Sequence, residues 1–275
     1  MKKSALVKIA AAALALVSVS SAWAKPKPGR TVAQIQKSKV VKIAVFSDKK
    51  PFGYVDENGA YQGYDVYFAN RIAQDLGVKV QFVPVEPAAR VEVLETNKVD
   101  IVLANFTFTP ERAEKVDFAL PYMKVALGVV SPNGAITSPE QLNGKNLIVA
   151  KGTTAETYFT ENYPEVNLIK FDLYADTYTA LLQGRGDAFS TDNTEVLAWA
   201  IENPGFAVGI DSLGNLDTIN PAVKKGNTDL LNWLNAEIEK LGEENFFHAD
   251  YEATLRDVYG AESDADSLVV EGGKL

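Results

Sequence analysis

Short apolar runs alternate with segments of helical periodicity along most of the chain. The apolar runs at 40–46 and 78–83 flank a segment at 65–76 whose apolar residues recur on one helical face. A second helical segment at 90–96 then leads into an apolar run at 101–104. This alternation predicts a parallel sheet of the α/β class, because each strand is followed by a helix that can cross back over the sheet.

The same order of elements begins again in the second half of the chain. After a long apolar run at 123–131, the pattern predicts strands at 146–150, 167–171 and 187–190, with helices between them. A second unit of the same kind is therefore expected.

One motif occurs once in each half. Residues 94–100, LETNKVD, and residues 181–187, LLQGRGD, share a leucine, a helix-ending Asn97 or Gly184, a basic residue and an aspartate six positions after the leucine. Chance similarity over so few residues is the alternative, but the shared order of elements on both sides argues against it. We predict two similar α/β lobes, the second beginning near Gly128.

The last part of the chain, from about Ala222, contains a strongly amphipathic segment. Its apolar residues recur at helical spacing, and we expect them in a core: Leu230, Trp233, Leu234, Ile238 and Leu241. A helix this apolar must pack on a lobe. A return to the first lobe would give two chain crossings and a hinge, but the pattern alone leaves that return open.

The first 24 residues have the organisation of a signal peptide. Three lysines precede an apolar run at 9–19, and Ser-Ala-Trp-Ala at 21–24 fits a signal peptidase site. A membrane anchor is the alternative, but the run is shorter than the ~20 residues that span a bilayer. No cysteine follows the site, which excludes lipid attachment there. We therefore predict a soluble protein of the periplasm that begins at Lys25.

Composition excludes several classes of function. Without the three lysines of the leader, 24 of the 27 basic residues remain against 36 acidic residues, so the formal net charge is about -12, which argues against a nucleic-acid partner. The chain has no cysteine, and its single histidine, His248, is predicted to be a structural residue on a helix surface. No cofactor and no metal site are predicted.

Polar residues follow the equivalent strands of the two halves. Asn105 and Thr107 come five and seven residues after Asp100, and Asp192 comes five residues after Asp187. In open parallel sheets, ligands bind outside the carboxyl ends of the strands. If the two lobes face each other, a carboxylate on one lobe lies opposite hydrogen-bonding side chains on the other.

Arg112 lies in the first turn of a short helix that Thr109 and Pro110 open. The helix dipole disfavours a cation there by ~0.3 to 1 kcal/mol. An anion in front of the helix would reverse that effect, and a guanidinium matches a carboxylate in two parallel hydrogen bonds. The alternative is a surface salt bridge with Glu111 or Glu114.

A second helix start offers further donors. Thr153, with Glu156 three residues later, fits a capping box, which would leave Thr154 as the first helical residue with a free amide. Two helix N-termini and Arg112 would together hold a carboxylate, and Asp192 could hold an ammonium group nearby. A carboxylate and an ammonium one carbon apart describe an α-amino acid.

These motifs resemble those of the periplasmic solute-binding proteins of polar amino-acid ABC transporters, within family 3 of the solute-binding proteins. The resemblance covers nearly the whole mature chain and rests on the segments 51–77, 97–123, 151–156, 184–193 and 222–227. It implies a two-lobed periplasmic-binding-protein fold with two hinge crossings. Lobe 1 would comprise 25–127 and 222–275, and lobe 2 would comprise 128–221.

The resemblance also implies a set of ligand-binding residues: Phe52, Arg90, Asn105, Thr107, Arg112, Thr153, Thr154 and Asp192. Arg112, with Thr107 and Thr154, would hold the α-carboxylate of the ligand. Asp192 and the Asn105 region would hold its α-amino group. The protein would act as a monomer that delivers the amino acid to an inner-membrane permease complex.

Selectivity for the ligand side chain is implied by two further positions. Phe52 would cover the ligand from the loop after the first strand. Arg90 stands where many relatives have an aliphatic residue and where aspartate and glutamate binders have arginine; the alternative is a solvated helix start. The segments at 105–130 and 151–164 and the tail EGGK are most similar to the cysteine-binding branch, so cysteine ranks first, then aspartate or glutamate, then cystine.

Two other classes of function compete with a binding protein. Periplasmic cyclohexadienyl dehydratases, which act on prephenate or arogenate, share the fold, but no glutamate or histidine is clearly placed to act as their acid. A receptor sensor domain is disfavoured because no transmembrane segment follows the lobes.

Overall fold

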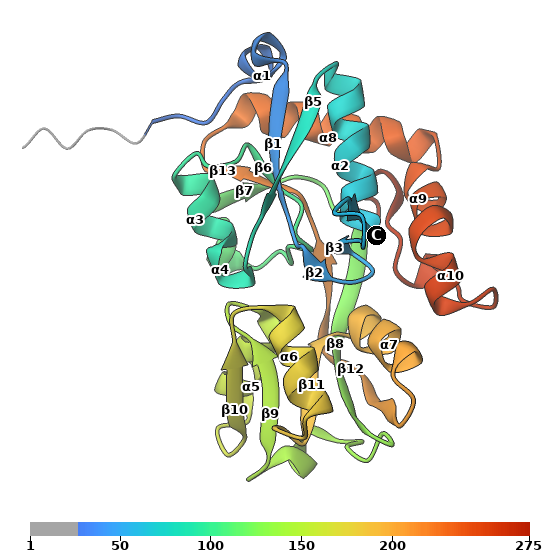
Figure 1. The fold of residues 1–275 in the computed structure, drawn as a ribbon. Coiled ribbons are helices and arrows are strands. Elements are labelled where there is room, and N and C mark those ends of the chain that lie inside the picture. Colours follow the sequence, from blue (N-terminus) through green and yellow to red (C-terminus); the bar gives the residue numbers. More distant parts are fainter. Residues whose placement is uncertain (1–26) are drawn as a thin grey trace, which may run out of the picture.

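The computed structural model describes residues 27–275, so the predicted signal peptide lies outside the described residues. The chain forms two α/β lobes, each built on a five-stranded sheet, and the two lobes lie one above the other in Figure 1. The predicted fold class is confirmed.

The sheet of lobe 1 has the strand order β5-β1-β6-β13-β7. Its strands are β1 (Val40–Val45), β5 (Lys79–Pro84), β6 (Ile101–Val102), β7 (Val116–Phe118) and β13 (Ala222–Lys224). Strands β1, β5 and β6 are parallel, whereas β13 pairs antiparallel with both β6 and β7. Because β13 follows lobe 2 in the chain, the chain returns to lobe 1.

Helices and a small three-stranded sheet complete lobe 1. The helices are α1 (Val32–Ser38), α2 (Tyr64–Leu76), α3 (Arg90–Glu95), α4 (Pro110–Ala113), α8 (Thr228–Glu243), α9 (Phe246–Thr254) and α10 (Arg256–Tyr259). The small sheet consists of β2 (Asp48–Lys49), β3 (Gly53–Val55) and β4 (Tyr61–Gln62). Short 3-10 turns lie at Pro87–Ala89, Ala265–Ser267 and Glu271–Gly273.

Lobe 2 has the strand order β10-β9-β11-β8-β12. Its strands are β8 (Met123–Pro132), β9 (Asn146–Ala150), β10 (Asn167–Phe171), β11 (Ala188–Asp192) and β12 (Phe206–Ile219). Its helices are α5 (Thr154–Asn162), α6 (Tyr174–Leu182) and α7 (Asn193–Glu202), and a 3-10 turn lies at Pro139–Leu142. Strands β9, β10 and β11 are parallel, and β8 and β12 run antiparallel to their neighbours.

Strands β8 and β12 connect the lobes. They pair with each other from Phe206 opposite Pro132 to Ile219 opposite Met123, and the pairing shifts register three times along its length. Both strands run from one half of the molecule to the other (Figure 1). Two connecting strands side by side form a hinge, where a few residues absorb the changes in φ and ψ that move one lobe relative to the other.

The C-terminal helices pack on lobe 1. Leu230, Leu234, Ile238 and Leu241 are fully buried in the same core as the strands of the first sheet, and Trp233 packs against that core. The predicted core stripe is confirmed for these positions. Because these residues pack in the core of lobe 1, the chain returns to lobe 1 after lobe 2.

The repeated motif gives the same turn in both lobes. Asn97 and Gly184 both adopt left-handed φ, 57° and 69°, at the end of a helix. The residue after each donates its amide to a carbonyl five residues earlier in the chain, as in a Schellman motif. The similarity between the halves is therefore structural.

The aspartates that end the motif also play the same role. Asp100 accepts a hydrogen bond at 2.8 Å from the amide of Lys42, and Asp187 accepts one at 2.8 Å from the amide of Asn146. Each carboxylate thus fastens the helix-to-strand turn to the neighbouring parallel strand. Asp100 is buried and also pairs with Arg30, whereas Asp187 is exposed.

Replacing Asp100 with alanine is expected to lower the free energy of unfolding by about 2 to 3 kcal/mol, because a buried carboxylate loses charged hydrogen bonds. The matched change Asp187→Ala is expected to cost about 1 kcal/mol or less, since water can replace the lost acceptor. Urea unfolding followed by circular dichroism checks both values. Equal losses of unfolding free energy in the two variants would show that the burial of Asp100 does not make it more important for stability than Asp187.

His248 lies on α9 and contacts the C-terminal tail. Its Nδ1 is 2.9 Å from Glu271 and its Nε2 is 2.9 Å from Asp266. Burial opposes its charge, but the hydrogen bonds to these two carboxylates outweigh burial and raise the pKa of His248. These contacts fit the structural role expected from the sequence.

Candidate ligand-binding site

Six of the eight predicted ligand-binding residues line one small cavity between the lobes. They are Arg90, Asn105, Thr107, Thr153, Thr154 and Asp192, and Ala155, Tyr174 and Thr191 complete the lining. The cavity has a volume of about 10 Å³, which is on the scale of one water molecule. The lobes therefore meet closely over this site.

Arg112, in α4, does not line this cavity; with Thr154, which lines both, it lines an adjoining cavity of about 560 Å³. Thr109 caps the helix by accepting a hydrogen bond from the Arg112 amide at 3.2 Å. The guanidinium donates to the carbonyl of Thr107 at 2.8 Å and, across the lobes, to the carbonyl of Gly152 at 2.8 Å. Burial, together with the nearby charge of Arg90, lowers the pKa of Arg112 to about 9.

The alternative role for Arg112, a surface salt bridge, is wrong. Within residues 27–275 Arg112 forms no ion pair with any carboxylate. A cation that has only carbonyl partners in a poorly hydrated position is stabilised by an anion placed beside it. The surroundings of Arg112 therefore favour an anionic ligand group.

Arg90 is buried, so the predicted alternative of a solvated helix start is wrong; only 3% of its surface is exposed. Its guanidinium donates at 2.9 to 3.2 Å to the carbonyls of Pro87, Ala104, Asn105 and Gly152. These bonds use four of the five N–H groups of a guanidinium. Arg90 mainly fixes the strand end of lobe 1 and contacts lobe 2.

The start of α5 supplies hydroxyl and amide groups from lobe 2. Thr153 accepts a hydrogen bond from the Glu156 amide at 3.3 Å and donates to the carbonyl of Ala150 at 2.7 Å. The Glu156 carboxylate bonds the amide of Gly152, at 2.6 Å, so the predicted capping box is displaced by one residue. Thr154 is the first helical residue, as predicted, and lines the cavity.

Asp192 lies at the end of β11, opposite the predicted lobe 1 residues. Its Oδ2 lies 2.9 Å from the Nζ of Lys49, which reaches across from lobe 1. Lys49 is also 2.9 Å from Glu195 and donates to the side-chain oxygen of Asn105 at 2.6 Å. Burial opposes the charge of Lys49, but Asp192 and Glu195 outweigh burial and raise the pKa of Lys49.

The lysine fixes the orientation of the Asn105 amide. An ammonium group can only donate hydrogen bonds, so the amide oxygen of Asn105 must face Lys49. The amide nitrogen is buried and has no partner within residues 27–275. The amide nitrogen of Asn105 therefore offers a donor to a ligand.

Two buried side chains hold the loop that carries Asn105. Asp65, at the start of α2, accepts two hydrogen bonds. One comes from the backbone amide of Asn105 at 2.8 Å, and the other comes from the Tyr122 hydroxyl at 2.6 Å. Burial raises the pKa of Asp65 to about 7. Tyr122 directly precedes the hinge strand β8, so one carboxylate connects the ligand loop to the start of the hinge.

Phe52 takes a different place from the one expected. It is fully buried in the core of lobe 1 and does not line the cavity. Tyr174, from the start of α6, lines the cavity, and the centre of its ring lies 4.7 Å from the Lys49 nitrogen. In this closed arrangement Tyr174 provides the aromatic wall of the site.

Comparison with known proteins places this geometry in a family. Residues 41–252 match the family of bacterial extracellular solute-binding proteins, family 3. The chain belongs to this family. The resemblance found in the sequence is thereby confirmed.

Two solved structures of solute-binding proteins are similar over nearly the whole chain. The solute receptor for L-cysteine of Neisseria gonorrhoeae is 54% identical, covers 88% of this chain and 100% of its own, and superposes with a TM-score of 0.86. The cysteine-binding protein from Campylobacter jejuni is 53% identical, covers 87% of this chain and 98% of its own, and has a TM-score of 0.85.

A relative with a different named ligand is more distant. The ABC transporter glutamine-binding protein GlnH of Bacillus subtilis (strain 168) is 30% identical over 236 residues, which cover 82% of this chain and 85% of the relative. The named relatives of this solute-binding protein are therefore amino-acid-binding proteins. They do not favour the dehydratase alternative.

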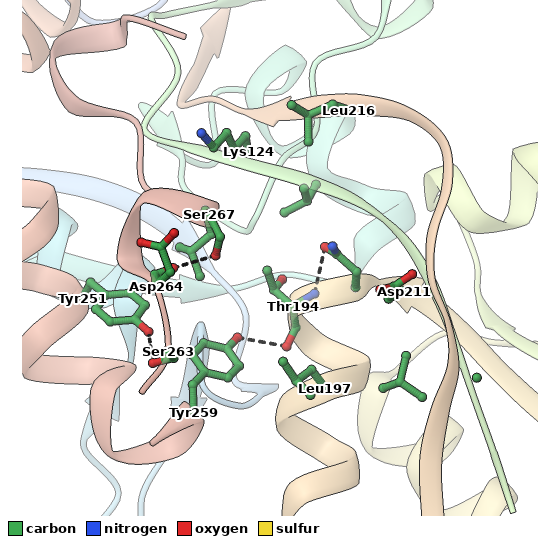
Figure 2. Close-up of a pocket in the computed structure, with 15 residues that line it drawn as sticks. Lys124, Thr194, Leu197, Asp211, Leu216, Tyr251, Tyr259, Ser263, Asp264 and Ser267 are labelled. Atoms are coloured by element: carbon green, nitrogen blue, oxygen red, sulfur yellow. Dashed lines mark hydrogen bonds between the residues drawn. The ribbon is translucent and has the colours of Figure 1, made fainter. Parts of the chain in front are cut away.

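A larger cavity of this solute-binding protein lies beside the hinge (Figure 2). It has a volume of about 600 Å³ and is lined by β8, β12, α7 and the C-terminal helices. The hydroxyl of Tyr259 donates to the carbonyl of Thr194 there, at 2.9 Å, which joins the two lobes (Figure 2). No predicted ligand-binding residue lines this cavity, so the smaller one remains the candidate site.

Neither a membrane span nor a metal cluster is found in the described part of this solute-binding protein. Across residues 27–275 no helix has both the length and the apolar character to cross a bilayer. In the same range no three histidine, aspartate or glutamate side chains are grouped to hold a metal ion.

Proposed function

We propose that this solute-binding protein is the periplasmic substrate-binding component of an amino-acid ABC importer and that it binds L-cysteine between its lobes. The observation that carries the proposal is the placement of Arg112 and Asp192. The guanidinium of Arg112, which has no anionic partner within residues 27–275, lies next to Thr154, and Thr154 and the Asp192 carboxylate of the other lobe both line the small cavity. A zwitterion matches both groups.

The carboxylate half of the ligand would contact three groups. Arg112 supplies the charge, and the amide and hydroxyl of Thr154 add donors at the start of α5. Thr107 and the Asn105 amide nitrogen lie on the same loop of lobe 1. Thr153 shapes the helix start and supports Thr154.

The ammonium half would contact Asp192. Only Oδ2 of this carboxylate is held by Lys49, which leaves Oδ1 to accept a hydrogen bond from the ligand. The ammonium group then contacts lobe 2, while the carboxylate contacts both Arg112 of lobe 1 and Thr154 of lobe 2. Closure and binding stabilise each other for that reason.

The site favours a small, uncharged ligand side chain. A carboxylate side chain would need the forked pair of donors of a free guanidinium, but Arg90 has one N–H group left. Any amino acid must widen this cavity, whose volume is about 10 Å³, and a long side chain would widen it most and break the bonds of Arg90 and Arg112 to Gly152. The small thiol of cysteine requires less widening, and the two solved structures named above are a cysteine-binding protein and a solute receptor for L-cysteine.

Transport follows from the two-lobed geometry. We expect a monomer whose lobes close on the amino acid by bending β8 and β12, and whose closed surface is recognised by an inner-membrane permease complex. The closed state would signal to the permease complex that the ligand is bound.

Calorimetry of refolded, ligand-free protein tests the function. L-cysteine under reducing conditions is expected to bind with micromolar affinity, about -8 kcal/mol, and more tightly than L-aspartate, L-glutamate or L-cystine. Binding of none of these would contradict an amino-acid-binding function. Tighter binding of aspartate would contradict only the cysteine assignment.

We propose a binding protein rather than an enzyme. The nine residues that line the cavity include no glutamate and no histidine, and the one carboxylate, Asp192, is paired with Lys49. A dehydratase needs an acid placed against the leaving hydroxyl. Turnover of prephenate is therefore expected to be undetectable.

A further inference from the structure

Three consecutive residues of lobe 1 contact lobe 2. Asp48 accepts the amide of Ala175 at 3.0 Å, and Lys50 pairs with Glu202 at 2.7 Å. Both contacts are exposed, so water and salt weaken them. Between them, Lys49 is buried, with 1% of its side chain exposed.

Lys49 lies behind the ligand cavity and does not line it. Its nitrogen is 2.9 Å from both Asp192 and Glu195, which places the two carboxylates within about 6 Å of each other. It also holds the oxygen of Asn105. One ammonium group thus bonds a lobe 1 residue and two lobe 2 residues.

The two carboxylates repel each other when the lobes exclude water. The titratable and charged groups that face Glu195 are Lys49 of β2, Asp192 at the start of α7, Tyr174 and Tyr178 of α6, and Tyr259 of α10. Among them Lys49 is the cation. Without it, the closed site would hold two like charges, and one carboxylate would take up a proton.

The same lysine decides which atom Asn105 offers. Because Nζ donates to the amide oxygen, the amide nitrogen remains for an acceptor on the ligand. If the amide turned, its oxygen would compete with Asp192 for the ligand ammonium group and a donor to the ligand carboxylate would be lost. The orientation of Asn105 therefore depends on Lys49.

We propose that Lys49 is a positioning residue for amino-acid binding, which acts from behind the site by fixing Asn105 and Asp192 and by balancing the charge of Glu195. This role rests on the proposed function, since it requires an amino acid in the cleft. Lys49 does not touch the ligand. It makes the site selective for a zwitterion by balancing the charges of Asp192 and Glu195 and by orienting the Asn105 side chain.

The test compares Lys49→Met with Lys50→Met in calorimetry at pH 7. K49M is expected to weaken L-cysteine binding at least thirtyfold, because the closed site is left with unbalanced carboxylates. K50M removes the neighbouring exposed ion pair between the lobes and is expected to stay within threefold of the wild type. Circular dichroism verifies that each variant is folded.

The pH profile separates positioning from a purely structural bond. From pH 5.5 to 7.5, below the ordinary pKa of the cysteine thiol of about 8.5, the wild-type profile is the reference, because Asp65, whose pKa burial raises to about 7, also titrates in this range. In K49M, closure raises the pKa of one carboxylate, so binding takes up a proton. The affinity of K49M relative to the wild type should then fall as pH rises, by up to about tenfold per unit.

A double variant tests the charge balance directly. Adding Glu195→Gln to K49M removes the carboxylate that Lys49 balances, so K49M/E195Q is expected to regain at least tenfold of the lost affinity and to lose the pH dependence. The double variant also keeps the test valid if K49M alone is poorly folded.

The outcomes distinguish this proposal from the proposed function. A wild type that binds none of L-cysteine, L-cystine, L-aspartate, L-glutamate and L-glutamine overturns both. If the wild type binds one of them, the variants are measured with that amino acid. K49M with wild-type affinity, or with a loss that is independent of pH and not recovered by E195Q, overturns the role of Lys49 alone.

Discussion

Replacing Arg112 with alanine is expected to weaken the binding of every amino acid that the wild type binds by roughly 30-fold or more. The guanidinium has carbonyl partners but no anion within residues 27–275, so the ligand carboxylate would be its charged partner. Truncating one partner of a poorly hydrated, hydrogen-bonded charge pair costs about 2 to 5 kcal/mol, which is roughly a 30- to 5,000-fold loss of affinity. Calorimetry with L-cysteine measures it.

Arg185→Ala provides the matched control for this prediction. Arg185 is exposed on lobe 2, where its guanidinium carbon lies 5.1 Å from the centre of the Phe171 ring, and it does not line the cavity. Its removal is expected to change the affinity less than threefold. Arg112→Lys should recover only part of the loss, because an ammonium carries the charge without the forked geometry. Wild-type affinity in R112A would contradict the carboxylate-binding role.

The sequence predicts the fold because its signals are local. Apolar runs, helix stops and the repeated motif at 94–100 and 181–187 each depend on neighbours a few residues apart. The structure confirms the repeat down to the left-handed Asn97 and Gly184. Asp192 lines the cavity opposite Asn105 because each follows the aspartate of its motif by five residues.

The residues missed by sequence reasoning act over long range. Lys49 reaches Asp192 across 143 positions of the chain, and Asp65 reaches Asn105 across 40. Nothing in the periodicity around Lys49 or Asp65 marks these partners. A buried aspartate at the start of a helix and a lysine next to a predicted cleft are weak signals that become specific only when the fold brings the partners together.

Strand periodicity also fails near the site. An alternation continued past Val102 would bury Phe108, but 42% of Phe108 is exposed. Asn105 adopts φ of 43°, which turns the backbone out of the strand. The hydrogen bond from the Asn105 amide to Asp65 stabilises that turn. At this point a long-range hydrogen bond, and not the local strand pattern, determines the backbone conformation.

Replacing Asp192 with asparagine is expected to remove the preference of the site for a zwitterion. The change keeps the shape of the side chain but removes the charge that would face the ligand ammonium group, while Lys49 keeps its ion pair with Glu195. Binding of L-cysteine is expected to weaken about a hundredfold, or about 3 kcal/mol. Calorimetry at pH 7 measures the loss.

A ligand without the ammonium group isolates the role of Asp192. 3-Mercaptopropionate has the carboxylate and thiol of cysteine but no amine, so the wild type should bind it much more weakly than L-cysteine. In D192N its affinity should stay within threefold of the wild-type value, because no charged partner is lost. Asp211 is an exposed acid on β12, and Asp211→Asn should leave the affinity for both ligands unchanged. An equal loss for both ligands in D192N would mean that Asp192 acts on closure alone, since an effect on the lobes does not depend on whether the ligand carries an amine.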